Sequence, residues 1–172
     1  MSTRRTGLGM LLAAAVGALL LLTYIFSGLI ERRQSVSLPA SQNIAGRTEV
    51  VLQADRKGHF VAPGRINGQS VRFLVDTGAT LVSVPASLAG ELGLERTVPV
   101  GLETAAGPVS GWMTRADQVQ LGDIVRHDVA VAISPANSDT VLLGMSFLRH
   151  LDLDQKGGRL RMTALKNEES LR

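Results

Sequence analysis

The sequence contains no cysteine among its 172 residues. This absence excludes disulfide bonds, thiolate metal sites and a cysteine nucleophile. Aromatic residues make up only 3% of the chain, with one Trp and one Tyr, which argues against a stacking platform for single-stranded nucleic acid. The histidines His59, His127 and His150 are scattered and form no i,i+4 pair. We therefore expect neither a metal site nor a cofactor.

The chain also lacks a basic excess outside its N-terminus. The formal net charge is +3, and residues 1–33 account for all of it with four Arg and one Glu. Residues 34–172 hold 14 basic and 14 acidic residues, which cancel. Because a nucleic-acid-binding domain is normally basic, we expect no nucleic-acid partner.

One long hydrophobic run is present, from residue 8 to residue 30, and its 23 residues carry no charge. As a helix it would reach ~34 Å, enough to cross a hydrocarbon core of ~30 Å. A cleaved signal peptide is the alternative interpretation, but the run exceeds the usual ~7–15 apolar residues and no small-x-small site closes it. We predict a short tail at 1–7 and an uncleaved transmembrane signal anchor at 8–30, embedded in a lipid bilayer. Basic residues flank both ends, so the positive-inside rule barely sets the orientation, and the simplest topology places the C-terminal part outside.

The rest of the chain is predicted to form one β-rich domain at residues 49–163, between a polar linker at 31–48 and a C-terminal tail at 164–172. Asn67-Gly68 joins two β-rich runs and predicts a hairpin with a type I′ turn. Residues 98–102 and 109–121 look like the arms of a long hairpin. A single helix is expected at 86–92, with Gly93 as its C′ residue. The fold class is therefore all-β, a small closed or folded barrel with one or two short helices.

The segment with the clearest chemistry is FLVDTGAT, from Phe73 to Thr80. It places Asp76 at the end of an apolar strand, where ionising a carboxylate is costly. Two such carboxylates in contact share one proton, so that one is a base while the other is an acid. Such a pair can activate a water and protonate an amide leaving group. The alternative interpretation is an ordinary strand-to-turn Asp that bonds nearby backbone amides.

The sequence resembles the retropepsin-like aspartic proteases, and in particular their bacterial membrane-anchored, single-domain group. The matching segments are GHFVAPGRINGQSVRFLVDTGAT at 58–80 and VLLGMSFLRHLDL at 141–153. The resemblance implies a barrel of retropepsin type, with Asp76 as the catalytic carboxylate. Thr77 would bond across a dimer axis and Gly78 would allow the close turn. Ala79 and Thr80 would complete the supporting loop.

The same resemblance assigns two further segments. Packing beside the active-site loop is implied for Leu142, Leu143 and Gly144. By position, a flap over the substrate would have its tip at Ala105, Ala106, Gly107 and Pro108. Trp112 lies in one arm of that flap, and we favour a core or dimer contact for it over a substrate contact.

The chain holds a single Asp-Thr-Gly, at 76–78, so a carboxylate pair requires a second copy. A C₂ homodimer places identical residues on its axis. We therefore expect a membrane-anchored aspartic endopeptidase that cleaves protein or peptide substrates as a homodimer. In a Gram-negative host, as the resemblance suggests, the domain would lie in the periplasm, tethered to the inner membrane. The competing hypothesis is a catalytically idle, protease-like binding or scaffold module at the membrane.

Overall fold

The structure is a computed structural model that describes residues 16, 19, 40–44, 47–104 and 107–165. The chain divides into two compact units, Met1–Ser35 and Val36–Arg172. In the first unit only Val16 and Leu19 are described, and both are helical; the rest of the predicted span at 8–30 lies outside the described residues. Within the described part of the chain, no helix has the length and hydrophobicity needed to span a membrane.

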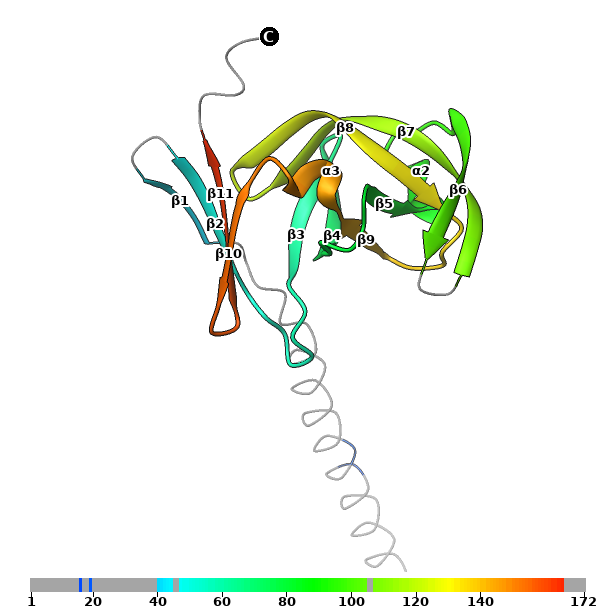
Figure 1. The fold of residues 1–172 in the computed structure, drawn as a ribbon. Coiled ribbons are helices and arrows are strands. Elements are labelled where there is room, and N and C mark those ends of the chain that lie inside the picture. The colour runs from blue at the N-terminus through cyan, green and yellow to red at the C-terminus, as the bar shows by residue number, and fades with distance from the viewer. Residues whose placement is uncertain (1–15, 17–18, 20–39, 45–46, 105–106, 166–172) are drawn as a thin grey trace, which may run out of the picture. The chain divides into compact units, whose positions relative to one another are not determined.

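The second unit is built around a six-stranded barrel. Its strands follow the order β3-β4-β9-β5-β8-β7, and β7 pairs back with β3 to close the ring (Figure 1). A seventh strand, β6, extends the sheet by pairing with β7. The strand bounds are β3 Val61–Ile66, β4 Gln69–Val75, β5 Val82–Pro85, β6 Val98–Thr104, β7 Gly107–Leu121, β8 Ile124–Ser134 and β9 Thr140–Leu143. The expectation of an all-β barrel is confirmed.

Closure of the barrel depends on a glycine in β3. A Cβ atom on Gly64 would lie 2.5 Å from the carbonyl oxygen of Gln120 in β7 and closer still to the Phe73 ring in β4. Real Cβ atoms do not approach other atoms so closely. Gly64 therefore lets β7 reach β3 and lets the fully buried Phe73 fill the barrel interior.

A four-stranded antiparallel sheet packs on the same hydrophobic core. Its order is β1-β2-β11-β10, with bounds β1 Ala40–Ile44, β2 Arg47–Gln53, β10 Asp152–Lys156 and β11 Arg159–Leu165. Val50, Leu52, Leu160 and Met162 are buried in the core cluster. Alternation along β2 and β11 then places Glu49 and Arg161 on the opposite face, where their side chains form an ion pair of 3.5 Å.

Strands of this sheet extend beyond the predicted domain bounds of 49–163. Strand β1 lies within the segment 31–48 that was predicted to be a linker, and β11 runs to residue 165. Every residue of β10 is exposed, including Asp152 and Asp154 on one face. Charged side chains on an exposed edge strand discourage pairing with another chain.

The predicted Asn-Gly hairpin is present. Asn67 and Gly68 have φ angles of 50° and 80°, as a type I′ turn requires. The Asn67 side chain extends beyond the turn: its Nδ2 donates to the carbonyl oxygen of Leu92 at 2.9 Å, and its Oδ1 accepts from the amide of Gln118 at 3.1 Å. The Asn67 side chain therefore also fixes β7 and the segment around Leu92.

Two short helices are described, α2 at Ala86–Ala89 and α3 at Met145–Leu148. The helix predicted over 86–92 thus has a shorter regular part than expected. Its ending follows the prediction, because Gly93 adopts a φ of 66°. The amide of Leu94 donates to the carbonyl of Ala89 at 2.9 Å, and that of Gly93 to Gly90 at 3.2 Å. These two bonds are the pattern of a glycine C′ cap.

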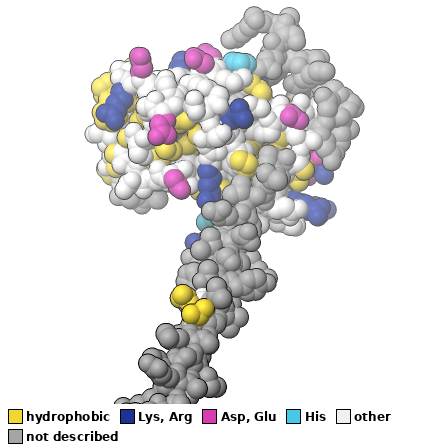
Figure 2. Space-filling model, turned by 180° about the vertical axis from the view of Figure 1, so that it is seen from behind, with side chains coloured by type: hydrophobic (Ala, Val, Ile, Leu, Met, Phe, Trp, Pro, Cys, Tyr) yellow, Lys and Arg dark blue, Asp and Glu magenta, His cyan; other side chains and the backbone are white. Residues whose placement is uncertain are grey.

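The surface of the domain carries both signs of charge. On the face shown in Figure 2, acidic and basic side chains are interspersed rather than gathered by sign. This agrees with the 14 basic and 14 acidic residues after residue 33.

Candidate active site

Strand β4 of the barrel wall ends at Val75, directly before Asp76. It runs parallel to β9, and Val75 pairs with Leu143. Directly after this pair, the amide of Asp76 donates to the carbonyl oxygen of Leu143 at 3.1 Å. The last hydrogen bond of the parallel ladder therefore fixes the backbone of Asp76, whose side chain is half-buried.

A tight turn orients the Asp76 carboxylate. Oδ1 accepts a hydrogen bond of 2.9 Å from the amide of Gly78, and the amide of Ala79 donates to the Asp76 carbonyl at 3.3 Å. A Cβ on Gly78 would lie only 3.2 Å from Oδ1, so glycine eases this approach. Thr77, Gly78 and Thr80 are exposed. The turn thus presents one oriented carboxylate at the edge of an exposed loop.

The segment 142–144 lies against this loop. Gly144 is buried, and a Cβ there would lie 2.7 Å from the carbonyl oxygen of Ala79 and still closer to that of Leu81. The next residue, Met145, donates its amide to the Ala79 carbonyl at 2.8 Å. The structure therefore brings together residues 142–144 and 76–80, which are distant in the sequence.

The two predicted hairpin arms form the β6–β7 hairpin, with Val98 opposite Met113 and Thr104 opposite Gly107. At the tip, Gly107 has a φ of 106° and its carbonyl accepts a 2.7 Å hydrogen bond from the Thr104 hydroxyl. Pro108 is exposed. The remaining predicted tip residues, 105 and 106, lie outside the described residues.

Trp112 lies in the β7 arm of this hairpin and is partly buried against the hydrophobic core. The guanidinium carbon of Arg96 lies 4.6 Å from the centre of the Trp112 ring, within the range of a cation–π interaction. The core contact preferred for this residue from the sequence is therefore present.

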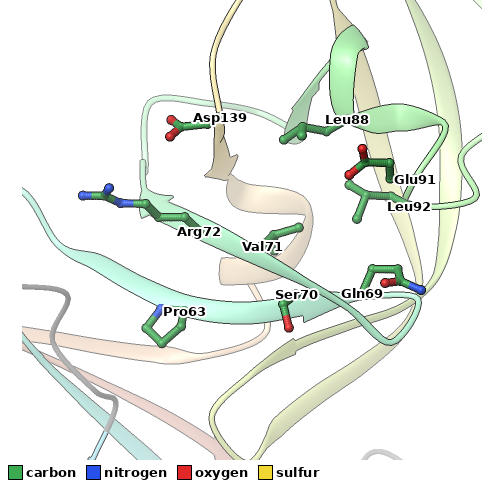
Figure 3. A pocket seen from close by; sticks show the side chains of 9 residues that line it. All are labelled: Pro63, Gln69, Ser70, Val71, Arg72, Leu88, Glu91, Leu92 and Asp139. Carbon is green, nitrogen blue, oxygen red and sulfur yellow. The ribbon is translucent and has the colours of Figure 1, made fainter. Parts of the chain in front are cut away.

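A surface cavity of about 290 Å³ lies elsewhere in the domain. Leu88, Glu91 and Leu92 line one side and strand β4 lines the other (Figure 3). Arg72 and Asp139 add charge at its rim. No residue of 76–80 or 142–144 contributes to its lining, so this cavity is separate from the candidate active site.

Sequence reasoning missed one residue next to the loop. Ser146 is buried, and its hydroxyl accepts a 2.9 Å hydrogen bond from the amide of Val82, just after the loop. The available signal was a lone hydroxyl in the apolar run VLLGMSFL, because a buried hydroxyl needs partners.

Residues 62–150, just over half of the chain, match the family model described as "gag-polyprotein putative aspartyl protease". This chain belongs to the retropepsin-like aspartic protease family. A solved retropepsin-like aspartic protease from Rickettsia conorii is similar, with 21% identity and a TM-score of 0.58, over 73% of this chain and 94% of that one. At this identity the likeness supports the fold alone.

Two further proteins are similar to this chain. The EIAV protease in complex with the inhibitor HBY-793 matches with 16% identity and a TM-score of 0.47, over 57% of this retropepsin-like chain and 92% of that one. A Sinorhizobium sp protein described as "Uncharacterized protein in cobV 5'region" is 30% identical over 135 residues. That match covers 76% of this chain and 56% of the relative, so the chain spans little more than half of the relative's length.

Proposed function

We propose that this retropepsin-like chain is a membrane-anchored aspartic endopeptidase that hydrolyses peptide bonds as a homodimer. The observation that carries the proposal is the Asp76 carboxylate, which stands at the end of β4 with Oδ1 held by the Gly78 amide at 2.9 Å. The alternative, an Asp that only stabilises its own turn, would need no more than this bond to the Gly78 amide. The additional support of the loop by residues 143–146, together with the family membership, favours a catalytic carboxylate.

The chemistry needs two Asp76 carboxyl groups that share one proton. The ionised carboxylate takes a proton from water while the water oxygen attacks the carbonyl carbon of the substrate. The protonated carboxyl donates its proton to the carbonyl oxygen, which gives a neutral tetrahedral intermediate. When the intermediate collapses, the carboxyl that took the water proton gives it to the nitrogen and the carbon–nitrogen bond breaks. The other carboxylate takes a hydroxyl proton from the intermediate, which restores the shared proton of the pair. Two like charges in contact cannot both persist, so the pair holds an acid and a base at one pH.

Two observations support a homodimer: the number of Asp-Thr-Gly motifs in the chain and the exposure of the loop that carries this motif. Each chain supplies a single Asp-Thr-Gly, and Thr77 and Gly78 are exposed, so a second copy can reach the loop. A C₂ axis beside Thr77 would bring the two Asp76 residues together. A shared membrane anchor would raise the local concentration of subunits and favour this pairing.

The anchor and its location form a separate part of the proposal. The uncharged run at 8–30 supports a single-pass anchor, and we place the domain in the periplasm of a Gram-negative cell. A C-terminal alkaline phosphatase fusion tests this topology: activity supports an extracytoplasmic domain, and an inactive but stable fusion contradicts it.

Purified full-length chain in detergent tests the proposed activity. Wild type should cleave an unfolded protein substrate, and a statine-type inhibitor should block the cleavage because its hydroxyl takes the place of the attacking water in the tetrahedral intermediate. Asp76→Asn should abolish cleavage while the melting temperature stays close to that of wild type. Asp154→Asn, on the exposed strand β10, is the matched control and should cleave like wild type.

Two results would contradict the proposal. Cleavage by Asp76→Asn at the wild-type rate would exclude Asp76 as the catalytic group. A wild-type chain that stays monomeric at high concentration and cleaves nothing would favour the idle binding or scaffold module instead.

A further inference from the structure

A single buried hydroxyl connects three separate segments of the retropepsin-like domain. Ser146 in α3 is 7% exposed. Its Oγ accepts from the amide of Val82 in β5 at 2.9 Å and donates to the carbonyl oxygen of Ala130 in β8 at 2.7 Å. Both partners are backbone groups, so the hydroxyl stabilises a backbone arrangement rather than another side chain.

The position of this hydroxyl within the sheet is informative. Strands β5 and β8 run parallel, with Val82 opposite Val131. In a parallel pair, the amide of one residue can bond the carbonyl that precedes its partner. For Val82 opposite Val131, that carbonyl belongs to Ala130. The Ser146 hydroxyl contacts both groups and so bridges the first rung of the ladder, where β5 leaves the active-site loop.

Three backbone hydrogen bonds hold the active-site loop at 76–80 to residues 143–146. The amide of Asp76 donates to Leu143, that of Met145 to Ala79 at 2.8 Å, and that of Ser146 to Thr80 at 3.0 Å. Any residue type except proline can donate these backbone hydrogen bonds. Within the described part of the chain, the Ser146 hydroxyl is the only side-chain group of residues 143–146 that forms a hydrogen bond to the loop or its exit.

We propose that Ser146 is a positioning residue, which sets the exit of the loop at Val82 and thereby the placement of the Asp76 carboxylate. The kinetic consequence of this inference rests on the proposed function, whereas the structural consequence does not. Without the hydroxyl, the Val82 amide and the Ala130 carbonyl either stay unpaired or bond each other directly. Direct bonding requires β5 to move toward β8, and this movement displaces the loop.

Displacement of Asp76 should lower kcat and leave KM nearly unchanged, because Ser146 is buried and acts through the loop. Misplacement of a catalytic group by about 1 Å can cost about 100-fold in rate, so we expect kcat of Ser146→Ala to fall by about 10- to 100-fold. The matched control is Thr163→Val, which removes a half-buried hydroxyl from β11, in the sheet that does not carry the loop. Among the described residues, the Thr163 hydroxyl forms no hydrogen bond to the loop.

The experiment combines kinetics with NMR of the full-length chain in micelles. Gly78 reports on the carboxylate, because its amide donates to Asp76, and Val82 reports on the bridge. Ser146→Ala should move the Gly78 amide resonance and speed exchange of the Val82 amide by about tenfold or more. Thr163→Val should leave both at their wild-type values. If Ser146→Ala fails to fold, the variant Ser146→Cys takes its place, because a thiol fills the site with a slightly larger group that is a weaker donor and acceptor.

The outcomes separate this inference from the proposed function. A Gly78 resonance unchanged in the Ser146 variant, or moved equally by Thr163→Val, would overturn the positioning role. A rise in KM at constant kcat would also overturn it. If wild type shows no Asp76-dependent cleavage, the proposed function fails, and the NMR comparison alone still decides whether Ser146 positions the loop.

Discussion

The contact between Gly144 and the active-site loop leads to a quantitative prediction for Gly144→Ala. A Cβ at this position would lie 2.7 Å from the Ala79 carbonyl oxygen and closer still to that of Leu81. Carbon and oxygen atoms normally approach to about 3.3 Å, so the loop must retreat by about 0.6 Å or more. The backbone angles of Gly144, φ −93° and ψ −173°, suit alanine, which makes the effect purely steric.

The expected cost of Gly144→Ala has two parts. Overpacking a buried site costs about 1–3 kcal/mol. Weakening the hydrogen bond from Met145 to Ala79 adds about 1 kcal/mol. The free energy of unfolding should therefore fall by about 2–4 kcal/mol, which lowers the melting temperature by about 6–20 °C for a domain of this size.

Thermal unfolding of the full-length chain, followed by circular dichroism, measures this effect. Gly90→Ala is the matched control, because Gly90 has helical angles and no atom lies within 4 Å of the added Cβ. Its melting temperature should equal or exceed that of wild type, since alanine favours helical backbone by about 0.5–1 kcal/mol. A Gly144→Ala chain that melts with wild type would refute the argument that the loop backbone needs glycine there.

Two further predictions concern the turns that support the barrel. Asn67→Gly keeps the positive φ but removes the side-chain bonds to Leu92 and Gln118; urea denaturation should show a loss of about 1–3 kcal/mol, and an unchanged midpoint would contradict these bonds. The pKa of Asp55 is lowered, and the largest cause is the hydrogen bond that its carboxylate accepts from the amide of His59. The ionised Asp55 should therefore stabilise the fold fully above about pH 4, the pKa in the unfolded chain, and this stabilisation should be lost as the pH falls. Melting temperatures of Asp55→Asn and wild type should accordingly converge in acid, and a constant gap down to pH 2 would exclude this effect.

Features encoded locally could be predicted from the sequence. Asn67-Gly68 sets its own turn through positive φ angles, and Gly93 ends its helix in the same way. The Asp76 loop is also local, because its carboxylate bonds an amide only two residues away. Each of these features depends on neighbouring residues, whose identities the sequence states directly.

Several features that depend on distant partners could not be predicted. Strand β1, with the weakly β-forming sequence ASQNI, is a strand because β2 pairs with all five of its residues. The need for glycine at position 64 arises only when β7 reaches β3. The partners of Ser146 lie 64 and 16 residues away along the chain, and no local pattern identifies them.

The central claim is that two copies of Asp76 form one active site, and a mixing experiment tests it most directly. Wild type and Asp76→Asn are unfolded together in equal amounts, refolded in detergent and assayed for peptide cleavage at fixed total protein. Random pairing makes about one quarter of the dimers fully wild type, so the account predicts about one quarter of the all-wild-type activity. Half of that activity would mean that each chain acts alone, and would contradict the shared carboxylate pair.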